Sequence, residues 1–265
     1  MNCALLAVAT SQILLAMKVE EQKIGIRSQR QNVQIPVITI SPSDPWGAML
    51  ILPGGNGILN DDVGKISSKN DFLLRTAKLF AEEGLQVFIP GPASDQNRWG
   101  YKFRTSSSHL QDLKSLATVM KNQSLPFWIA ASSRGTISAS WASDVMSDAK
   151  GMILLSPITH IPRHHKAVLI NSKRIKNAKI PTLIVSNRFD RCPVSPIKGA
   201  YQLKEELKHI IPVDFVEISD GLASSKEKKC SPLGPHGFGG NTKKVMKVIN
   251  DWMESTLNNS QDAVE

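Results

Sequence analysis

The chain has 265 residues, of which 41% are apolar and 21% charged. This composition, without internal repeats or low-complexity tracts, is typical of a globular protein with a sizeable core and excludes a repeat protein. The formal net charge of +9 is basic, but the lysines and arginines are scattered without interleaved aromatic residues or a nucleic-acid-binding motif, so we do not expect nucleic acid as a partner.

The first 17 residues, MNCALLAVATSQILLAM, form an uncharged and mostly apolar segment. About 15 apolar residues are too few for a comfortable membrane span, so we predict no stable one. The segment resembles the apolar core of a secretory signal, and Ala7–Ala9 resembles a cleavage site. We therefore expect residues 1–17 to be a leader and the protein to be exported, periplasmic or extracellular. The alternative is an extra N-terminal helix packed on the domain, since the basic start of a signal is missing.

Strands and helices are predicted to alternate along the rest of the chain. Residues 22–28 and 33–41 alternate in polarity, which predicts an antiparallel hairpin at a sheet edge. Six further strands are predicted at 48–53, 85–91, 126–131, 151–157, 180–187 and 213–219. Helices are predicted at 70–84, 106–122, 134–148, 195–208 and 241–257.

The caps and connections complete this pattern. Asn70 is expected to cap the first helix and Asn241 the last, and residues 92–108 are expected to form a long loop. Six core strands joined by crossover helices predict an α/β protein with a mostly parallel central sheet and helices on both faces. Since the connections are short, we expect a single domain over residues 18–265, with its ligand at the carboxyl ends of the strands.

The stretch FWIAASSRGTISAS passes from an apolar strand to a helix of small residues through two adjacent serines. A serine nucleophile gains reach on a very tight strand-to-helix turn, which requires small residues two positions before and after it. Ala131 and Gly135 meet this requirement for Ser133, whereas Arg134 fits badly two positions after Ser132. The pattern predicts Ser133 as the nucleophile. The alternative is a serine that only caps the helix.

A serine hydroxyl needs a base to take its proton, and the expected chain order is serine, acid, histidine. Asp190 follows the strand in TLIVSNRFD, and His236 lies in the loop SPLGPHGFGG between the last strand and the last helix. Alone, each has a simpler explanation, a turn carboxylate for Asp190 and a surface histidine for His236. In the expected order at strand ends, they predict a Ser-His-Asp triad with Ser133.

An acyl-transfer site also needs hydrogen-bond donors for the developing oxyanion. The glycine-rich stretch LPGGNG follows the first core strand and can supply the backbone amides of Gly55 and Asn56. The amide of Arg134, directly after the nucleophile, would be the other donor. The alternative is a glycine turn with no part in chemistry.

On these residues the chain resembles the α/β-hydrolase superfamily over about residues 20–257. More narrowly, it resembles a group of uncharacterised, mostly exported bacterial α/β hydrolases with an S-R-G-T elbow. The similar stretches are LPGGNG, FRTSSSHLQDL, SSRGTISA, NRFDRCPVSP and CSPLGPHGF. The resemblance implies the α/β-hydrolase fold, with Ser133 as nucleophile, Asp190 as acid and His236 as base. Members of the group usually have glycine where this chain has Ala131.

Two of the three cysteines flank the predicted acid and base. Cys192 follows Asp190 by two residues and Cys230 precedes His236 by six, while Cys3 lies in the predicted leader. If the acid and base touch, these cysteines are also close, so we predict a disulfide between them, which agrees with an oxidising compartment. The alternative is two free thiols in a cytosolic protein.

The surroundings of the site are predicted to be open. Residues 157–179 are too few for a large cap domain, and the loop at 94–104 is expected to wall the pocket. Trp99, Tyr101 and Phe103 could line it or pack beneath that loop.

Other basic and histidine side chains give weaker indications. Arg104 and His109 are expected to be structural loop anchors, and Arg134 either attracts an anionic acyl group or lies on the surface. No cofactor and no metal is predicted, because no carboxylate or cysteine is suitably spaced with the histidines at 160, 164 and 165.

The sequence therefore predicts a serine hydrolase that acts through an acyl-enzyme, on a small carboxylic ester. An amidase or peptidase of the same mechanism is the near alternative, because the chemistry is shared. A non-catalytic binding protein of the same fold is the alternative from another class. The sequence does not predict an oligomeric state.

Overall fold

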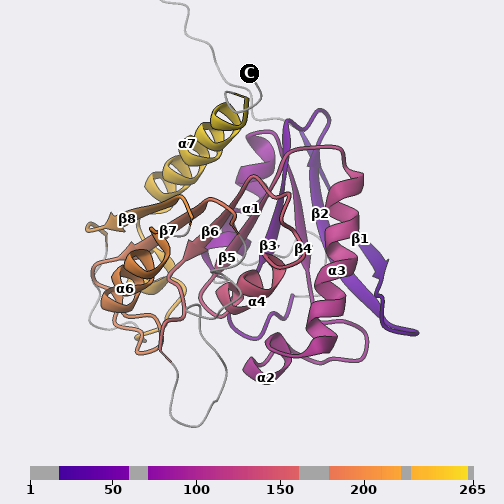
Figure 1. Ribbon diagram of the computed structural model, residues 1–265, viewed down its shortest axis with the longest axis horizontal. Helices are drawn as coiled ribbons and strands as arrows, with labels where there is room; N and C mark the ends of the chain where they lie inside the picture. The colour runs from indigo at the N-terminus through magenta and orange to yellow at the C-terminus, as the bar shows by residue number, and fades with distance from the viewer. Residues whose placement is uncertain (1–17, 60–70, 161–178, 210, 222–227, 262–265) are drawn as a thin grey trace, which may run out of the picture.

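The structure of the protein is a computed structural model, and the residues that it describes are 18–59, 71–160, 179–209, 211–221 and 228–261. One eight-stranded sheet runs through it in the order β1-β2-β4-β3-β5-β6-β7-β8 (Figure 1). The strands are β1 (Val19–Arg27), β2 (Gln34–Pro42), β3 (Gly47–Leu52), β4 (Leu85–Pro90), β5 (Phe127–Ser132), β6 (Gly151–Leu155), β7 (Thr182–Asn187) and β8 (Val213–Ile218). The hairpin β1–β2 is antiparallel and β3 to β8 are parallel, which confirms the predicted sheet.

Helices cover both faces of this sheet. They are α1 (Phe72–Glu82), α2 (Tyr101–Arg104), α3 (Ser107–Asn122), α4 (Gly135–Ala142), α6 (Ile197–Leu207) and α7 (Thr242–Gln261), with a 3-10 turn η1 (Pro235–Gly237). Met49 and Ile51 of β3 pack with α1 and α7, while Leu50 and Leu52 pack on the other face with α3, α4 and α6. Successive side chains of a strand point to opposite faces, so a fully apolar strand such as β3 stabilises two cores at once.

Three details differ from the sequence-based expectations. Asp71 caps α1 by accepting from the amide of Leu74 at 3.0 Å, whereas Asn70 lies outside the described residues. The loop expected at 92–108 contains the short helix α2. Helix α4 ends at Ala142 instead of near residue 148, because the backbone after it forms turns, with the Asp144 amide donating to the Trp141 carbonyl and the Val145 amide to the Ala142 carbonyl.

The parallel strands bring their carboxyl ends to one edge of the sheet. β5 lies between β3 and β6, and β7 follows β6. The segments after β3, β5 and β7 carry the predicted oxyanion donors, nucleophile and acid, so all three groups reach the same edge.

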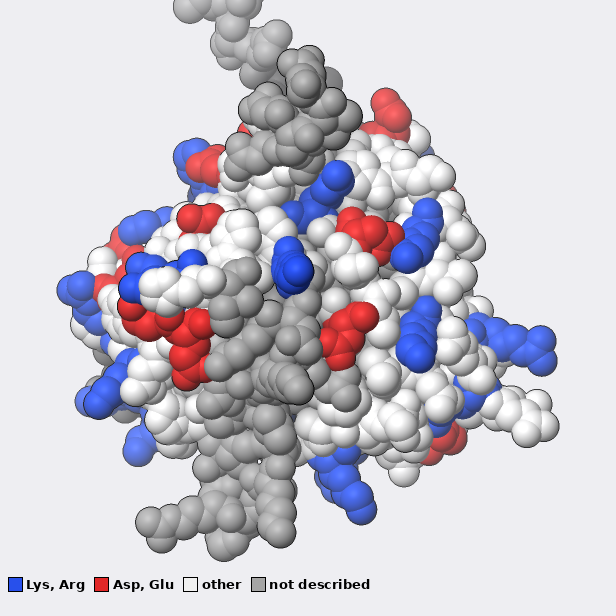
Figure 2. Space-filling view, viewed as in Figure 1, with Lys and Arg blue, Asp and Glu red and all other residues white. Residues whose placement is uncertain are grey.

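No helix in the described part of the chain is long and apolar enough to cross a membrane. On the face seen in Figure 2, lysines and arginines are dispersed among acidic and uncharged side chains and form no continuous patch. The predicted leader and Cys3 lie outside the described residues. Most of 157–179 does too, so the absence of a large cap domain stays a prediction.

Candidate active site

Ser133 lies on a sharp turn between β5 and α4. Its φ is 48°, a left-handed conformation that non-glycine residues adopt at a cost in strain. The turn is held on both sides, because the Ser133 amide donates to the carbonyl of Leu155 at 2.9 Å and its carbonyl accepts from the amide of Thr136 at 3.0 Å. The result is a half-buried serine at the edge of the sheet with its hydroxyl toward a cavity.

The small residues around Ser133 have clear steric reasons. A Cβ on Gly135 would lie 1.9 Å from the carbonyl oxygen of Leu52, so only glycine fits without moving β3. Ala131 is fully buried in β5 and pairs with Leu52 on one side and Leu154 on the other. Helix α4 can therefore start directly behind the turn.

The structure brings the three predicted catalytic side chains together. His236, in η1, has its Nε2 3.0 Å from the Oγ of Ser133 and its Nδ1 2.9 Å from the Oδ2 of Asp190. Asp190 follows β7, and both Asp190 and His236 are buried. Because a carboxylate only accepts, Nδ1 carries the proton toward Asp190 and Nε2 is left to accept from the serine hydroxyl.

Two further serines, which sequence reasoning missed, support the histidine and the acid. The Oγ of Ser195 lies 3.1 Å from the Oδ2 of Asp190 and 3.0 Å from the Nδ1 of His236. The hydroxyl of Ser156 donates to the carbonyl of His236 at 2.8 Å. The other carboxylate oxygen of Asp190 accepts from the amide of Cys192 at 2.8 Å. The imidazole and the carboxylate are therefore held from several sides.

Ser132 has a different environment from its neighbour. Its hydroxyl donates to the Oδ2 of Asp71 at 2.8 Å, and the residue is buried. The same oxygen of Asp71 accepts from the amide of Gly54 at 2.6 Å. Asp71 thus ties the strand end before the nucleophile to the glycine-rich loop, a role that the sequence did not predict.

The predicted oxyanion donors lie around the same cavity as Ser133. Gly55, Asn56 and Arg134 all line it. Among the described residues, none accepts a hydrogen bond from the backbone amides of Asn56 and Arg134. The Arg134 side chain donates to the Oδ1 of Asn56 at 3.0 Å and its guanidinium lies 4.9 Å from the centre of the Tyr101 ring. These contacts hold Arg134 at the cavity rim.

The cavity over Ser133 has a volume of about 550 Å³. Its apolar wall includes Ile58, Phe72, Leu74, Leu155, Val194 and Phe238. Asp71 and Arg134 are its charged side chains. A cleft that combines an apolar wall with a few convergent polar groups is typical of a small-molecule site.

The three aromatic residues of the 94–104 loop do not line this cavity. Trp99 is 1% exposed and packs beneath the backbone of Gly57, where a Cβ would lie 2.6 Å from the indole. Phe103 packs against His109, with ring centres 5.2 Å apart, and Tyr101 is buried below Arg134. The loop is therefore a support for the site and contributes its aromatic rings to packing.

The expected disulfide joins Cys192 to Cys230, with their Cα atoms 4.6 Å apart. Both cysteines line the cavity. The bond links the segment after Asp190 to the segment before His236, so it constrains the two loops that the hydrogen bond between acid and base must bring together.

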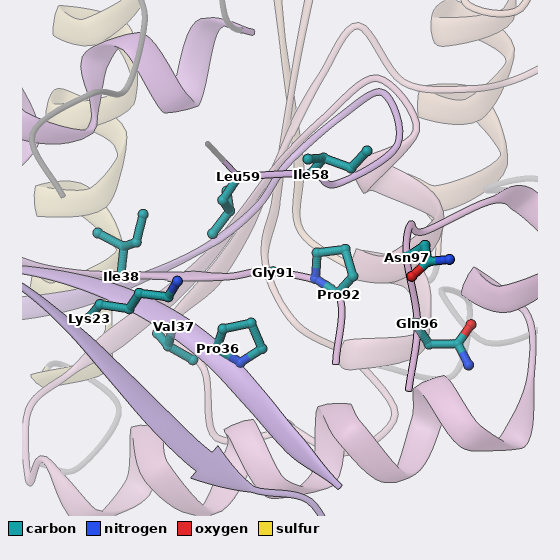
Figure 3. Close-up of a pocket in the computed structure, with 10 residues that line it drawn as sticks. All are labelled: Lys23, Pro36, Val37, Ile38, Ile58, Leu59, Gly91, Pro92, Gln96 and Asn97. Atoms are coloured by element: carbon teal, nitrogen blue, oxygen red, sulfur yellow. The ribbon is translucent and has the colours of Figure 1, made fainter. Parts of the chain in front are cut away.

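A second, smaller cavity of about 180 Å³ lies beside the hairpin (Figure 3). Pro36, Val37 and Ile38 form one side and Pro92, Gln96 and Asn97 the other, with Lys23 at the edge. Ile58 lines both cavities. Lys23 is the charged residue of this lining, so the second cavity has no group of acid and base residues for chemistry.

The described residues contain no cluster of three or more histidine, cysteine, aspartate or glutamate side chains that could hold a metal ion. His164 and His165 lie outside the described residues. His160 is exposed, and its Nδ1 lies 3.1 Å from the hydroxyl of Thr159.

Comparisons with known proteins agree with this geometry at the level of the fold. No family model matches the chain. No curated protein is similar to it in sequence. An esterase from Pyrococcus furiosus superposes with a TM-score of 0.62 at 13% identity, covering 95% of each chain.

Two other solved structures are similar. A dienelactone hydrolase from Anabaena variabilis gives a TM-score of 0.61 at 13% identity, over 89% of this chain and 98% of that one. A fungal esterase from Rhizomucor miehei gives 0.62 at 11% identity, over 93% and 86%. With its mostly parallel sheet and covering helices, the chain has the α/β-hydrolase fold.

Proposed function

We propose that this chain, an α/β-hydrolase fold with a serine, a histidine and an aspartate in hydrogen-bond contact at its sheet edge, is a serine hydrolase of carboxylic esters. The observation that supports this most is the continuous path from Asp190 through His236 to Ser133, with contacts of 2.9 and 3.0 Å. Structural neighbours described as esterases and dienelactone hydrolases favour ester substrates.

In the first half of the reaction, the Oγ of Ser133 attacks the ester carbonyl and its proton passes to the Nε2 of His236. The negative oxygen that forms is stabilised by the amides of Arg134 and of Gly55 or Asn56. His236 then gives the proton to the departing alkoxide, and the acyl group stays on Ser133. Asp190 stabilises the imidazolium during this transfer.

In the second half, water attacks the acyl-enzyme. His236 takes a proton from the water, and the same amides stabilise the second oxyanion. Collapse of this intermediate breaks the bond to Ser133 Oγ, which regains its proton from His236, and a carboxylic acid leaves. The chain supplies each of these groups itself, so no further reactant besides water is needed.

The cavity size and the disulfide suggest the setting of this reaction. A cleft of about 550 Å³ fits a small or medium-sized ester. A disulfide persists in oxidising compartments, so we place the enzyme in the periplasm or outside the cell, released from a leader at residues 1–17.

Hydrolysis of nitrophenyl esters of increasing acyl length tests this proposal. We expect turnover by the wild type and a fall of kcat/KM by at least about 10⁴-fold in Ser133→Ala, because the nucleophile is lost. The matched variant Ser132→Ala should stay within about tenfold, since that hydroxyl contacts Asp71 and is not the attacking group. A folded wild type that hydrolyses no ester, or an active Ser133→Ala variant, would contradict the proposal.

A further inference from the structure

Arg104, the last residue of α2, is fully buried and makes only neutral contacts. Its Nη2 donates to the carbonyl of Pro53 at 2.8 Å and lies 3.5 Å from the carbonyl of Gly55. Its Nη1 donates to the hydroxyl of Ser138 at 2.7 Å, and its Nε to the carbonyl of Trp99 at 3.3 Å. No carboxylate within the described chain forms an ion pair with it.

An unpaired buried charge is costly, so its position needs an explanation. Burial, together with the nearby cation of Arg134, lowers the pKa of Arg104 to about 9. The guanidinium therefore stays charged near neutral pH. Its two Nη2 contacts both go to carbonyls of the glycine-rich loop that carries the predicted oxyanion donors.

These contacts fix the peptide planes of that loop. In a trans peptide the carbonyl and the amide hydrogen point in opposite directions, and the structure has no cis peptide bond in its described part. The peptide between Pro53 and Gly54 is held at both ends, by Arg104 on its carbonyl and by Asp71 on its amide. The carbonyl of Gly55 faces Arg104, so the following amide, that of Asn56, points the other way.

Glycine at position 55 makes this constraint necessary. Gly55 has a φ of 56°, and a Cβ there would meet nothing within 4 Å, so no side chain restricts its backbone. The peptide before Gly55 is held by the hydrogen bond from the Gly57 amide to the Gly54 carbonyl at 3.1 Å, so the peptide after it, between Gly55 and Asn56, is the one that the Arg104 contact constrains. Rotation of the peptide between Gly55 and Asn56 would present a carbonyl in place of the Asn56 amide. A carbonyl would repel a developing oxyanion.

We propose that Arg104 is a positioning residue for oxyanion stabilisation: it holds the carbonyls of Pro53 and Gly55 on the buried side of the loop, so that the Asn56 amide faces the cavity. This inference rests on the proposed function of the site. Arg104 does not line the cavity over Ser133, and it acts through the backbone.

Arg104 is itself oriented by Ser138, whose hydroxyl also contacts the buried ring of His109. The hydroxyl of Ser138 accepts from Arg104, so its own hydrogen goes to the Nε2 of His109 at 2.9 Å. Nε2 must then be unprotonated. Burial lowers the pKa of His109 well below 6.5, and Arg104 and Arg30 lower it further, which agrees with a neutral ring. The lone pair of Ser138 is thereby directed at the guanidinium.

Arg104→Met and Arg104→Lys test the inference. With a nitrophenyl butyrate substrate, we expect kcat of the Met variant to fall about 10²- to 10³-fold, the effect of losing one oxyanion donor, while KM changes less than about threefold. Affinity for a trifluoromethyl ketone, which forms a tetrahedral oxyanion on the serine, should fall in parallel. The Lys variant should recover part of both losses, because an ammonium can still donate to a carbonyl.

Thr256→Ala is the matched control, since it removes a buried hydrogen bond to the indole of Trp128 away from the loop. It should lower stability and leave kcat unchanged. The inference would be overturned if kcat of the Arg104→Met variant stays within about threefold of the wild-type value. It would also be overturned if Arg104→Met and Thr256→Ala lose the same stability and have the same kinetic constants. An inactive wild type would instead overturn the proposed function.

If neither Arg104 variant folds, amide hydrogen exchange of the wild-type protein tests whether the Asn56 amide faces the cavity. The Gly54 amide should be protected by Asp71, whereas the Asn56 amide should exchange rapidly in the free protein and slow in the trifluoromethyl ketone adduct. An Asn56 amide already protected in the free protein would overturn the inference.

Discussion

Ser133 occupies a backbone conformation that glycine adopts more readily, and the residues around it are those that make this possible. Gly135 allows α4 to start against the carbonyl of Leu52, and the amide of Ser133 bonds to β6. The strain at Ser133 is thus offset by the hydrogen bond from its amide to β6 and by the hydrogen bond that its carbonyl accepts from the Thr136 amide.

Gly135→Ala is expected to lower the free energy of unfolding by about 2–3 kcal/mol, because the added methyl group overlaps the carbonyl oxygen of Leu52. The displaced turn should also reduce esterase activity. Gly100→Ala is the control, since a Cβ there meets nothing within 4 Å and should change stability by less than about 0.5 kcal/mol. Urea unfolding measures both variants, and equal stabilities would contradict the steric account.

His109→Gln is expected to flatten the loss of stability in acid. The pKa of His109 is well below 6.5 in the folded protein, so below about pH 6.5 the unfolded chain binds a proton that the folded chain does not. Above about pH 6.5 the neutral His109 ring contributes its full share to the free energy of unfolding. As the pH falls toward the pKa of His109 in the folded protein, that share is lost at up to about 1.4 kcal/mol per pH unit.

Urea unfolding of both proteins at about pH 7.5 and about pH 5 measures this difference. Glutamine does not titrate and can still accept from the hydroxyl of Ser138. The wild type should lose more stability than the variant between the two pH values. Parallel losses would show that His109 is not the group responsible.

At this scale, chain order and spacing predicted which serine, acid and histidine come together, because strand ends of a parallel sheet meet at one edge. They did not predict Asp71 or Ser195. The hydrogen bonds of both residues depend on how their side chains are oriented within loops, and the periodicity of the sequence does not predict that orientation. The burial of Trp99 was left open for the same reason. It depends on the backbone of Gly57, which lies 42 residues earlier in the sequence and packs over the indole.

Among the elements, the segments after β7 and β8 are joined by the disulfide. The positions of the strands and helices were predicted from apolar runs and helix caps. The hairpin at the sheet edge was predicted from the alternation of polar and apolar residues. The short helix α2 was missed because four residues carry too little periodicity to be distinguished from a loop.

Cys192→Ser combined with Cys230→Ser is expected to lower the free energy of unfolding by about 2–4 kcal/mol, since the bond closes a loop with a sequence separation of 38. Activity should fall as well, because Asp190 and His236 lie in the loops that become free. Reduction of the wild type by dithiothreitol should have the same effect and should leave the double variant unchanged. Unaltered stability and kcat would show that the disulfide does not support the site.

For the whole molecule, the two cores lie on opposite faces of one sheet, and β3 and β5 contribute to both. Unfolding of the core on one face of the sheet therefore disrupts β3 and β5, and with them the core on the other face. We propose that residues 18–265 form a single cooperative domain, with residues 1–17 as a separate leader.

A chain that begins at residue 18 is expected to unfold in one transition with the midpoint and esterase activity of the full chain, because we propose that residues 1–17 are a leader and not part of the domain. Thermal unfolding followed by calorimetry measures this. A lowered midpoint, or loss of solubility, would indicate that the first residues pack on the domain as a helix.

The most direct test of the account is mass spectrometry of the folded wild-type chain after reaction with a fluorophosphonate. We predict one phosphonyl group per chain, on the peptide that contains Ser133 and located on that residue by fragmentation, with far slower labelling in His236→Ala. Folded protein that gains no mass, or an adduct located on Ser132, would contradict the claim that Ser133 is the nucleophile.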